Sequence, residues 1–251
     1  MKNEKQQQVK ILLEKLRERE RLRTSGEEAA QRYQLIHHDR FHKTLEICKE
    51  LVPNSRVRVL DVGPSFFTTL LAQEYKDVST LGLDMITDHG GQRHASALAM
   101  TLPHIKFELN NSEDIKRWPK ITKPFDLIVY AETLEHLYTA PVYSLAFLSS
   151  FLAEKGILLV TTPNAAMIMK RFILLLKGKN PFEQIRLIGE NPGHYREYTM
   201  KELIDIGAQC QLDHIYAEYI NFYSSTNIIY GFLKCLKSTF KDSLVVAFRR
   251  M

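Results

Sequence analysis

The sequence predicts an α/β fold in which helices cover both faces of a mostly parallel, doubly wound sheet. Three observations lead to this prediction. Between Val57 and Asp84, a short apolar strand, a glycine turn, an apolar helix and a second strand follow one another. Between Phe125 and Thr161, a buried strand, a helix and another buried strand repeat the alternation. The chain has 251 residues, of which 45% are hydrophobic, so it can bury one good core.

The N-terminal part of the chain predicts a helical extension that precedes the sheet. It begins with a charged helical stretch whose apolar stripe is too short for a coiled coil. Ser25 and Glu28 then form a capping-box pattern, which predicts a second, longer helix. We therefore expect a helical extension or lid at residues 1–53 and one domain at residues 54–251, with a helical insertion near residues 165–190.

Polar residues stand where the first two predicted strands end. Asp61 and Gly63 follow the first strand, and Asp84 ends the second. In a doubly wound sheet, ligands bind at the carboxyl ends of the strands. Ser65 is predicted to cap the following helix, whose first N–H groups would then be available to an anionic ligand.

The fourth predicted strand, Phe125–Tyr130, leads into three further polar residues, Glu132, Glu135 and His136. If a helix begins near Glu132, a spacing of three and four residues places these side chains on one face of it. A polar run that includes Ser112 follows the preceding strand, which is expected at residues 105–109.

The remaining elements complete the sheet and add two amphipathic segments. Pro141 is expected to open a helix through residue 152, and Thr199 with Glu202 repeats the capping box before the last helix. Strands are predicted at residues 211–220 and 243–249. The segments 165–176 and 227–241 mix apolar with basic residues, so they are either lid helices that pack on the core or helices that contact a membrane surface.

Taken together, the segments DVGPSFF, FDLIVYAETLEHL and GILLVTTPN resemble the class I S-adenosylmethionine-dependent methyltransferases. The resemblance covers roughly residues 56–199, and it implies a seven-stranded sheet with an antiparallel last strand. It also implies that S-adenosylmethionine is the cofactor. The residues that this resemblance assigns to the cofactor are Asp61, Gly63, Ser65, Asp84, Ser112, Asp114 and Tyr130. The family usually has two or three glycines after the first acid, so the turn is shortened here.

The same resemblance implies a catalytic and metal-binding role for the residues after the fourth strand. His136, with Glu135, would act as the base that removes a proton from the acceptor. Glu132, Glu135 and His136 also match the Glu-x-x-Glu-His pattern of ubiquinone-pathway O-methyltransferases and small-RNA 3′-end 2′-O-methyltransferases, which bind a divalent cation with it. His194 stands where the RNA enzymes have a further ligand. The implied ion is Mg, Mn or Zn; the alternative is that Glu135 only fixes the helix start and no metal binds.

Three functions remain open at this stage. The first is a methyltransferase that methylates an oxygen of a small-molecule, lipid-like or saccharide acceptor. The second is a metal-dependent RNA 2′-O-methyltransferase, which the absence of a dense basic patch with interleaved aromatics disfavours. The third is a non-catalytic cofactor-binding or scaffold protein of the same fold, which the shortened glycine turn favours.

Composition limits the setting in which the protein works. The net charge of +5 mildly favours anionic partners, but it is spread along the chain. Three cysteines form no CxxC pair and no disulfide framework, which fits a reducing cytoplasm. We find no signal peptide and no run long enough to span a membrane, so we expect a cytoplasmic protein with at most a peripheral membrane contact.

Overall fold

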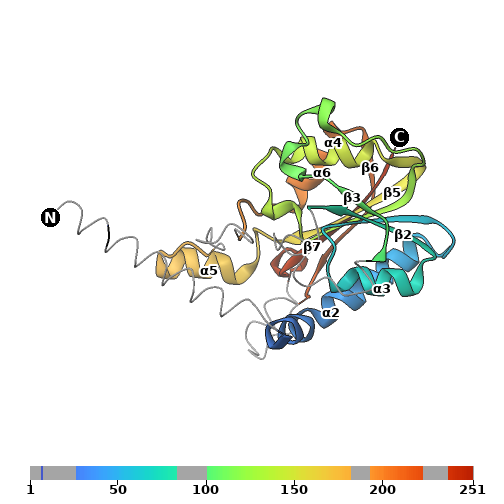
Figure 1. Ribbon diagram of the computed structural model, residues 1–251. Coiled ribbons are helices and arrows are strands. Elements are labelled where there is room, and N and C mark those ends of the chain that lie inside the picture. The colour runs from blue at the N-terminus through green and yellow to red at the C-terminus, as the bar shows by residue number, and fades with distance from the viewer. Residues whose placement is uncertain (1–6, 8–26, 84–100, 182–192, 223–236, 251) are drawn as a thin grey trace.

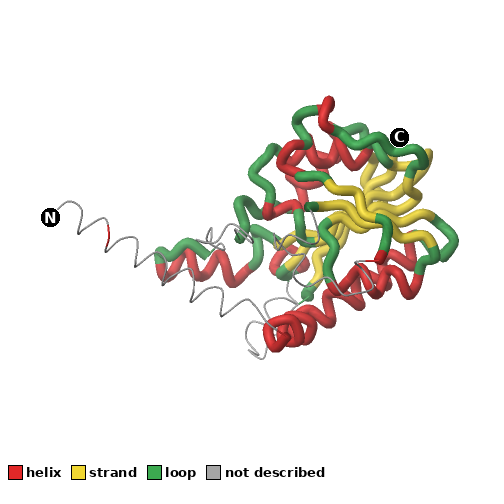
Figure 2. The backbone as a smooth tube through the Cα atoms, viewed as in Figure 1, coloured by secondary structure: helices red, strands yellow, loops and turns green. Residues whose placement is uncertain are grey.

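Seven strands form one mixed sheet with the order β3-β2-β1-β4-β5-β7-β6, and helices cover both of its faces (Figures 1 and 2). The computed structural model describes residue 7 and residues 27–83, 101–181, 193–222 and 237–250. The strands are β1 (Arg58–Val62), β2 (Asp77–Gly82), β3 (His104–Lys106), β4 (Phe125–Ala131), β5 (Leu152–Pro163), β6 (Leu212–Ile220) and β7 (Ser243–Arg250). The helices described over more than one turn are α2 (Glu27–Leu51), α3 (Phe66–Glu74), α4 (Pro141–Ser149), α5 (Ile168–Lys177) and α6 (Met200–Gln209).

The topology confirms the predicted doubly wound sheet. Strands β1 to β5 pair in parallel, and β7 lies antiparallel between β5 and β6. The chain proceeds from β1 outward to β3 and then returns to place β4 on the other side of β1. The carboxyl ends of β1 and β4 are therefore the switch point at which sheets of this kind bind their ligands.

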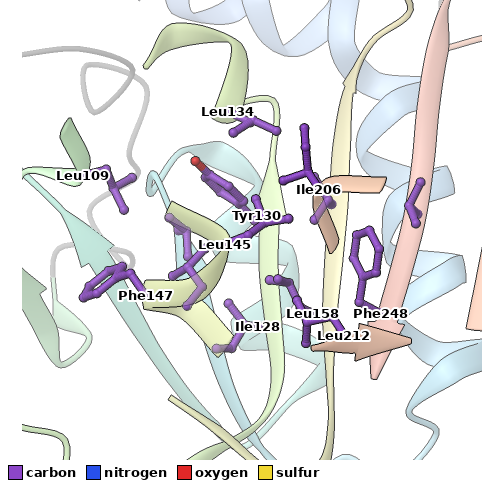
Figure 3. Close-up of a cluster of buried hydrophobic side chains, with 14 of the residues drawn as sticks. Leu109, Ile128, Tyr130, Leu134, Leu145, Phe147, Leu158, Ile206, Leu212 and Phe248 are labelled. Carbon is purple, nitrogen blue, oxygen red and sulfur yellow. The ribbon is translucent and has the colours of Figure 1, made fainter. Parts of the chain in front are cut away.

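Alternation along the strands divides the core between the two faces of the sheet, because successive side chains of a strand point to opposite sides. Val59 of β1 packs with Leu71 of α3 on one face. On the other face, Leu60 belongs to a second cluster. Figure 3 shows Leu145 of α4 and Ile206 of α6 in this cluster. This burial on both faces explains why the central strands are nearly continuous apolar runs.

Most predicted elements are present, although several boundaries were wrong. The third strand ends at Lys106 because Glu108 caps a 3₁₀ turn, accepting a hydrogen bond from the Asn110 N–H at 3.0 Å. β5 begins at Leu152, five residues early, because the strand continues through an irregularity in its pairing with β4. Correspondingly, α4 ends at Ser149.

Several predictions lie outside the described residues. They are the first N-terminal helix, the capping residue Ser25, a short helix after β2 and the greater part of the second amphipathic segment. The boundary between extension and domain at residue 53 stays a prediction, although Phe41 and Ile47 of α2 already belong to the core. None of the described helices is long and apolar enough to cross a membrane.

Candidate active site

The turn after β1 brings a buried carboxyl group to the carboxyl edge of the sheet. Asp61 is 3% exposed, and its Oδ2 accepts a hydrogen bond from Thr68 Oγ1 at 2.6 Å. The backbone N–H of Gly63 donates to the Leu81 carbonyl of β2 at 2.9 Å, which fixes the turn to the neighbouring strand. The acid, the turn and the start of α3 therefore form one rigid unit.

Gly63 is required here for two separate reasons. Its φ of 79° lies in the left-handed region that side chains with a Cβ rarely adopt. In addition, a Cβ at this position would lie 2.7 Å from Oγ1 of Thr133, in the loop after β4. The single glycine thus allows the β1 turn and the β4 loop to touch.

Ser65 caps α3 as predicted, and its partner is Thr68. Ser65 Oγ accepts from the Phe67 N–H at 3.2 Å, and the Ser65 N–H donates to Thr68 Oγ1 at 2.8 Å. Thr68 therefore both closes the capping box and bonds Asp61. Sequence reasoning missed Thr68, although its position three residues after Ser65 was a usable signal.

Burial raises the pKa of Asp61 to about 7, against the opposing effect of the Thr68 hydrogen bond. An unfolded chain would release this proton near its ordinary pKa of 3.8. Between these two pKa values the folded state holds more protons, so the free energy of unfolding falls as pH rises through this window.

Replacing Asp61 should remove this pH dependence. We expect Asp61→Asn to raise the melting temperature at about pH 8, where the wild type must bury a charge, and to change it little near pH 4. The variant keeps an oxygen that can accept from Thr68. Thermal melts across this pH range, with the exposed Asp213→Asn as control, would measure the effect; parallel melting curves for Asp61→Asn and wild type would contradict it.

The loop after β4 does not form the predicted helix from Glu132. Glu132 has a φ of 49°, and only residues 134–136 form a short 3₁₀ turn. Oε2 of Glu132 accepts from Arg40 of α2 at 3.3 Å, and Oε1 accepts from Thr161 of β5 at 3.0 Å. The prediction of one shared face was therefore wrong, because Glu132 precedes the turn and is held by α2 and β5.

Glu135 is almost completely buried, with 1% of its surface exposed. Its Oε2 accepts from Thr162 Oγ1 at 3.0 Å, and its backbone carbonyl accepts from the Tyr195 N–H at 2.8 Å. Burial, and then the nearby charge of Glu132, raise the pKa of Glu135 well above its ordinary value. Glu135 therefore fastens β5 and the loop before α6 to the loop after β4.

That fastening brings two histidines together. The rings of His136 and His194 lie 5.0 Å apart between centroids. His136 Nδ1 donates to the Gly193 carbonyl at 2.8 Å, and His194 Nδ1 lies 3.1 Å from Oε1 of Glu197. Burial opposes ionisation of Glu197, but its hydrogen bond to His194 and the charge of Lys170 lower its pKa overall.

Three of the four predicted metal ligands are brought together. Potential ligand atoms of Glu135, His136 and His194 all lie within 4.8 Å of one another. Glu132 is not in this group, because its carboxylate faces the Arg40 guanidinium. One carboxylate and two imidazoles are a donor set that Zn²⁺ or Mn²⁺ accepts.

The remaining predicted cofactor residues lie in different environments. Ser112 is buried, and its hydroxyl has no hydrogen-bond partner among the described residues. Asp114 is exposed and caps a short 3₁₀ turn through the Lys116 N–H. The ring of Tyr130, also predicted at the site, is fully buried in the core among Leu109, Leu134 and Leu145 (Figure 3). Asp84 lies outside the described residues.

Comparison with known proteins gives structural neighbours only. No family model matches the chain, and no curated protein does. The N-methyltransferase NodS from Bradyrhizobium japonicum WM9, solved with S-adenosyl-L-homocysteine, is 15% identical with a TM-score of 0.52 over 85% of this chain and 86% of NodS.

Two further solved structures have the same fold. The putative methyltransferase of Haloferax volcanii, solved with the activator Trm112, is 11% identical with a TM-score of 0.58 over 89% of this chain and 94% of that one. Magnesium protoporphyrin IX methyltransferase from Synechocystis PCC 6803, with bound SAH, is 12% identical with a TM-score of 0.53 over 86% of this chain and 85% of that one. At these identities the likeness establishes the fold.

Proposed function

We propose that this chain, which has the fold of class I S-adenosylmethionine-dependent methyltransferases, is itself a methyltransferase that acts on an oxygen atom of a small, lipid-like or saccharide acceptor. The observation that carries the proposal is the contact between the β1 turn and the β4 loop at Gly63 and Thr133. This contact places Asp61 and the Glu135–His136–His194 group at adjacent strand ends of one switch point. Cofactor and acceptor would meet there.

The residues of the β1 turn fit S-adenosylmethionine. The Asp61 carboxyl is buried, and none of the described basic side chains forms a salt bridge with it. The ammonium of the cofactor's methionine part would supply the missing positive charge, and Gly63 allows close backbone approach. Asp84 would accept the ribose hydroxyls, with Ser112 and Asp114 near the adenine. The bound cofactor supplies a methyl group already activated on its sulfonium.

His136 is the proposed base on the acceptor side. Its Nδ1 donates to the Gly193 carbonyl, so in the neutral ring the basic lone pair is on Nε2. That nitrogen can remove the hydroxyl proton as the oxygen attacks. Glu135 does not need to touch the acceptor, because its contacts with Thr162 and Tyr195 hold the two loops in place around His136.

Cofactor binding tests the proposal directly. A ligand present at about a hundredfold excess over Kd stabilises the native state by about 2.7 kcal/mol, which should raise the melting temperature by about 5–10 °C. We expect Gly63→Ala to lose most of this shift, because its Cβ would displace Thr133. Gly178→Ala is the matched control, since it also has a positive φ but no atom within 4 Å of the added Cβ. No shift in the wild type would favour a scaffold protein.

A metal-dependent methyltransferase, which includes the RNA 2′-O-methyltransferase alternative, is the second candidate. It is favoured by the mutual distance of at most 4.8 Å between ligand atoms of Glu135, His136 and His194. A divalent ion held there would lower the pKa of an acceptor hydroxyl.

Titration with Mn²⁺ would distinguish this metal-dependent enzyme from a methyltransferase that binds no metal. We expect Mn²⁺ to raise the melting temperature of the wild type and to leave that of His194→Ala unchanged. The control is His214→Ala, which removes an exposed histidine on β6; this variant should respond like the wild type. Equal responses from the His194 and His214 variants would exclude a metal at these residues.

A further inference from the structure

Helix α5 exposes an unusual amount of apolar surface. Phe172, Leu174, Leu175 and Leu176 are 37%, 52%, 79% and 77% exposed. Single exposed leucines are normal on protein surfaces, but Phe172, Leu175 and Leu176 lie close together on one side of the helix and form a patch. The helix extends from the carboxyl edge of the sheet, away from the body of the protein (Figure 1).

Most apolar side chains of α5 share one side of the helix. Phe172 lies four residues after Ile168, and Leu175 and Leu176 lie three and four residues after Phe172, so these four side chains form a row on one side. Leu174 lies outside this row. Ile168 is buried against the body, whereas the later members of the row are exposed. The row therefore begins in the core and emerges onto the surface over the length of α5.

The charged residues of α5 and of the turn after it are all basic. Residues 165–181 contain four basic residues and no acidic residue. Lys177 and Lys179 are exposed at the end of the helix, where Gly178 terminates it with a φ of 57°. Arg171 lies over the ring of Phe240, with its guanidinium carbon 5.6 Å from the centroid, and the exposed Lys237 comes shortly before this ring.

We infer that α5 docks this protein on the surface of an anionic phospholipid bilayer. The leucines would enter the boundary between headgroups and acyl chains, and the lysines would face the lipid phosphates. Charge complementarity selects this occupant. In a symmetric pair of chains, the exposed cations Arg171, Lys177 and Lys179 of one copy would face those of the other across the contact. RNA would engage the cations, but it would leave the exposed Leu174, Leu175 and Leu176 without an apolar partner.

The docking would also orient the candidate site, although it does not depend on the proposed methyl transfer. Lys170 of α5 forms an ion pair with Glu197, which also contacts His194 in the site. α5 and the site therefore belong to the same edge of the molecule. A bilayer contacted by α5 would lie at the edge of the molecule that holds the candidate site.

Vesicle sedimentation of the full chain tests the inference without any activity measurement. We expect the wild type to sediment with vesicles that contain phosphatidylglycerol and to stay in solution with pure phosphatidylcholine at the same low salt. Leu175→Ser/Leu176→Ser should lose binding. Lys177→Glu/Lys179→Glu should weaken it by at least about 25-fold, since each lost cation is worth about fivefold. Leu35→Ser, which changes a 78% exposed leucine on α2, is the matched control and should bind like the wild type.

Three results would overturn the inference. One is a wild type that stays in the supernatant with anionic vesicles. Another is a leucine variant that sediments like the wild type, because the contact would then lie elsewhere. The third is light scattering that shows a dimeric wild type and a monomeric leucine variant, neither of which sediments, because α5 would then bind a second copy of the chain. All the changed side chains are exposed, and melting curves would verify that each variant is folded.

Discussion

Replacing His136 with alanine should reduce the rate of methyl transfer by about 10²–10⁴-fold while cofactor affinity stays unchanged. The range is that of a positioned general base, and the loss should appear in kcat because the side chain acts on the acceptor and not on the β1 turn. The measurement is transfer of a labelled methyl group to an acceptor found by screening extracted metabolites and lipids, alongside the melting shift with S-adenosylmethionine.

The controls for His136 separate chemistry from folding. His214→Ala alters an exposed histidine near the amino end of β6, remote from the switch point, and should be fully active. His136→Gln preserves a polar side chain of similar reach but has no basic nitrogen, so it should be as inactive as the alanine variant. Activity of the glutamine variant near that of the wild type would assign His136 a positioning role only.

Replacing Arg40 with alanine should lower the free energy of unfolding by about 3–5 kcal/mol. The Arg40–Glu132 pair is buried, with side-chain exposures of 9% and 11%. Removing the guanidinium leaves the Glu132 carboxylate buried without a counter-charge, which costs far more than the pair itself contributes. Denaturant unfolding monitored by circular dichroism gives the value directly.

Two further variants test this explanation for Arg40. Arg40→Ala/Glu132→Gln removes both charges, so it should recover a large part of the loss. Lys49→Ala changes another residue of α2 and breaks a half-exposed ion pair with Glu74 of α3, which should cost no more than about 1 kcal/mol. If the double variant is no more stable than Arg40→Ala, the loss comes from packing of the arginine and not from the unpaired carboxylate.

The Arg40–Glu132 pair also bears on the question of the metal. Arg40 faces one of the acids that the sequence assigned to a divalent cation, and its charge is one of the influences that lower the pKa of Glu135. A fixed guanidinium thus already supplies positive charge at the end of β4. The three residues Glu135, His136 and His194 are the ones for which metal binding remains a proposal.

Local interactions explain what could be predicted from the sequence. The capping boxes at Ser65 and Thr199 connect residues only three positions apart, so they can be predicted from the local sequence. Likewise, the period of the apolar residues reveals which segments are strands and which are helices. The turn at Gly63 was also predicted, because a strand followed by an acid and a glycine is a local pattern.

Only the tertiary structure determines the contacts between segments that are distant in sequence. Arg40 meets Glu132 across 92 residues, and the Gly193 carbonyl accepts from His136 across 57. The left-handed backbone of Glu132, which separates it from the metal-ligand group, follows from its bonds to α2 and β5 and not from its own sequence. The sequence by itself therefore determined the order of the elements and the turn at the first strand. Packing determined which side chains share the site, because contacts between residues on different elements produce no periodic pattern in the sequence.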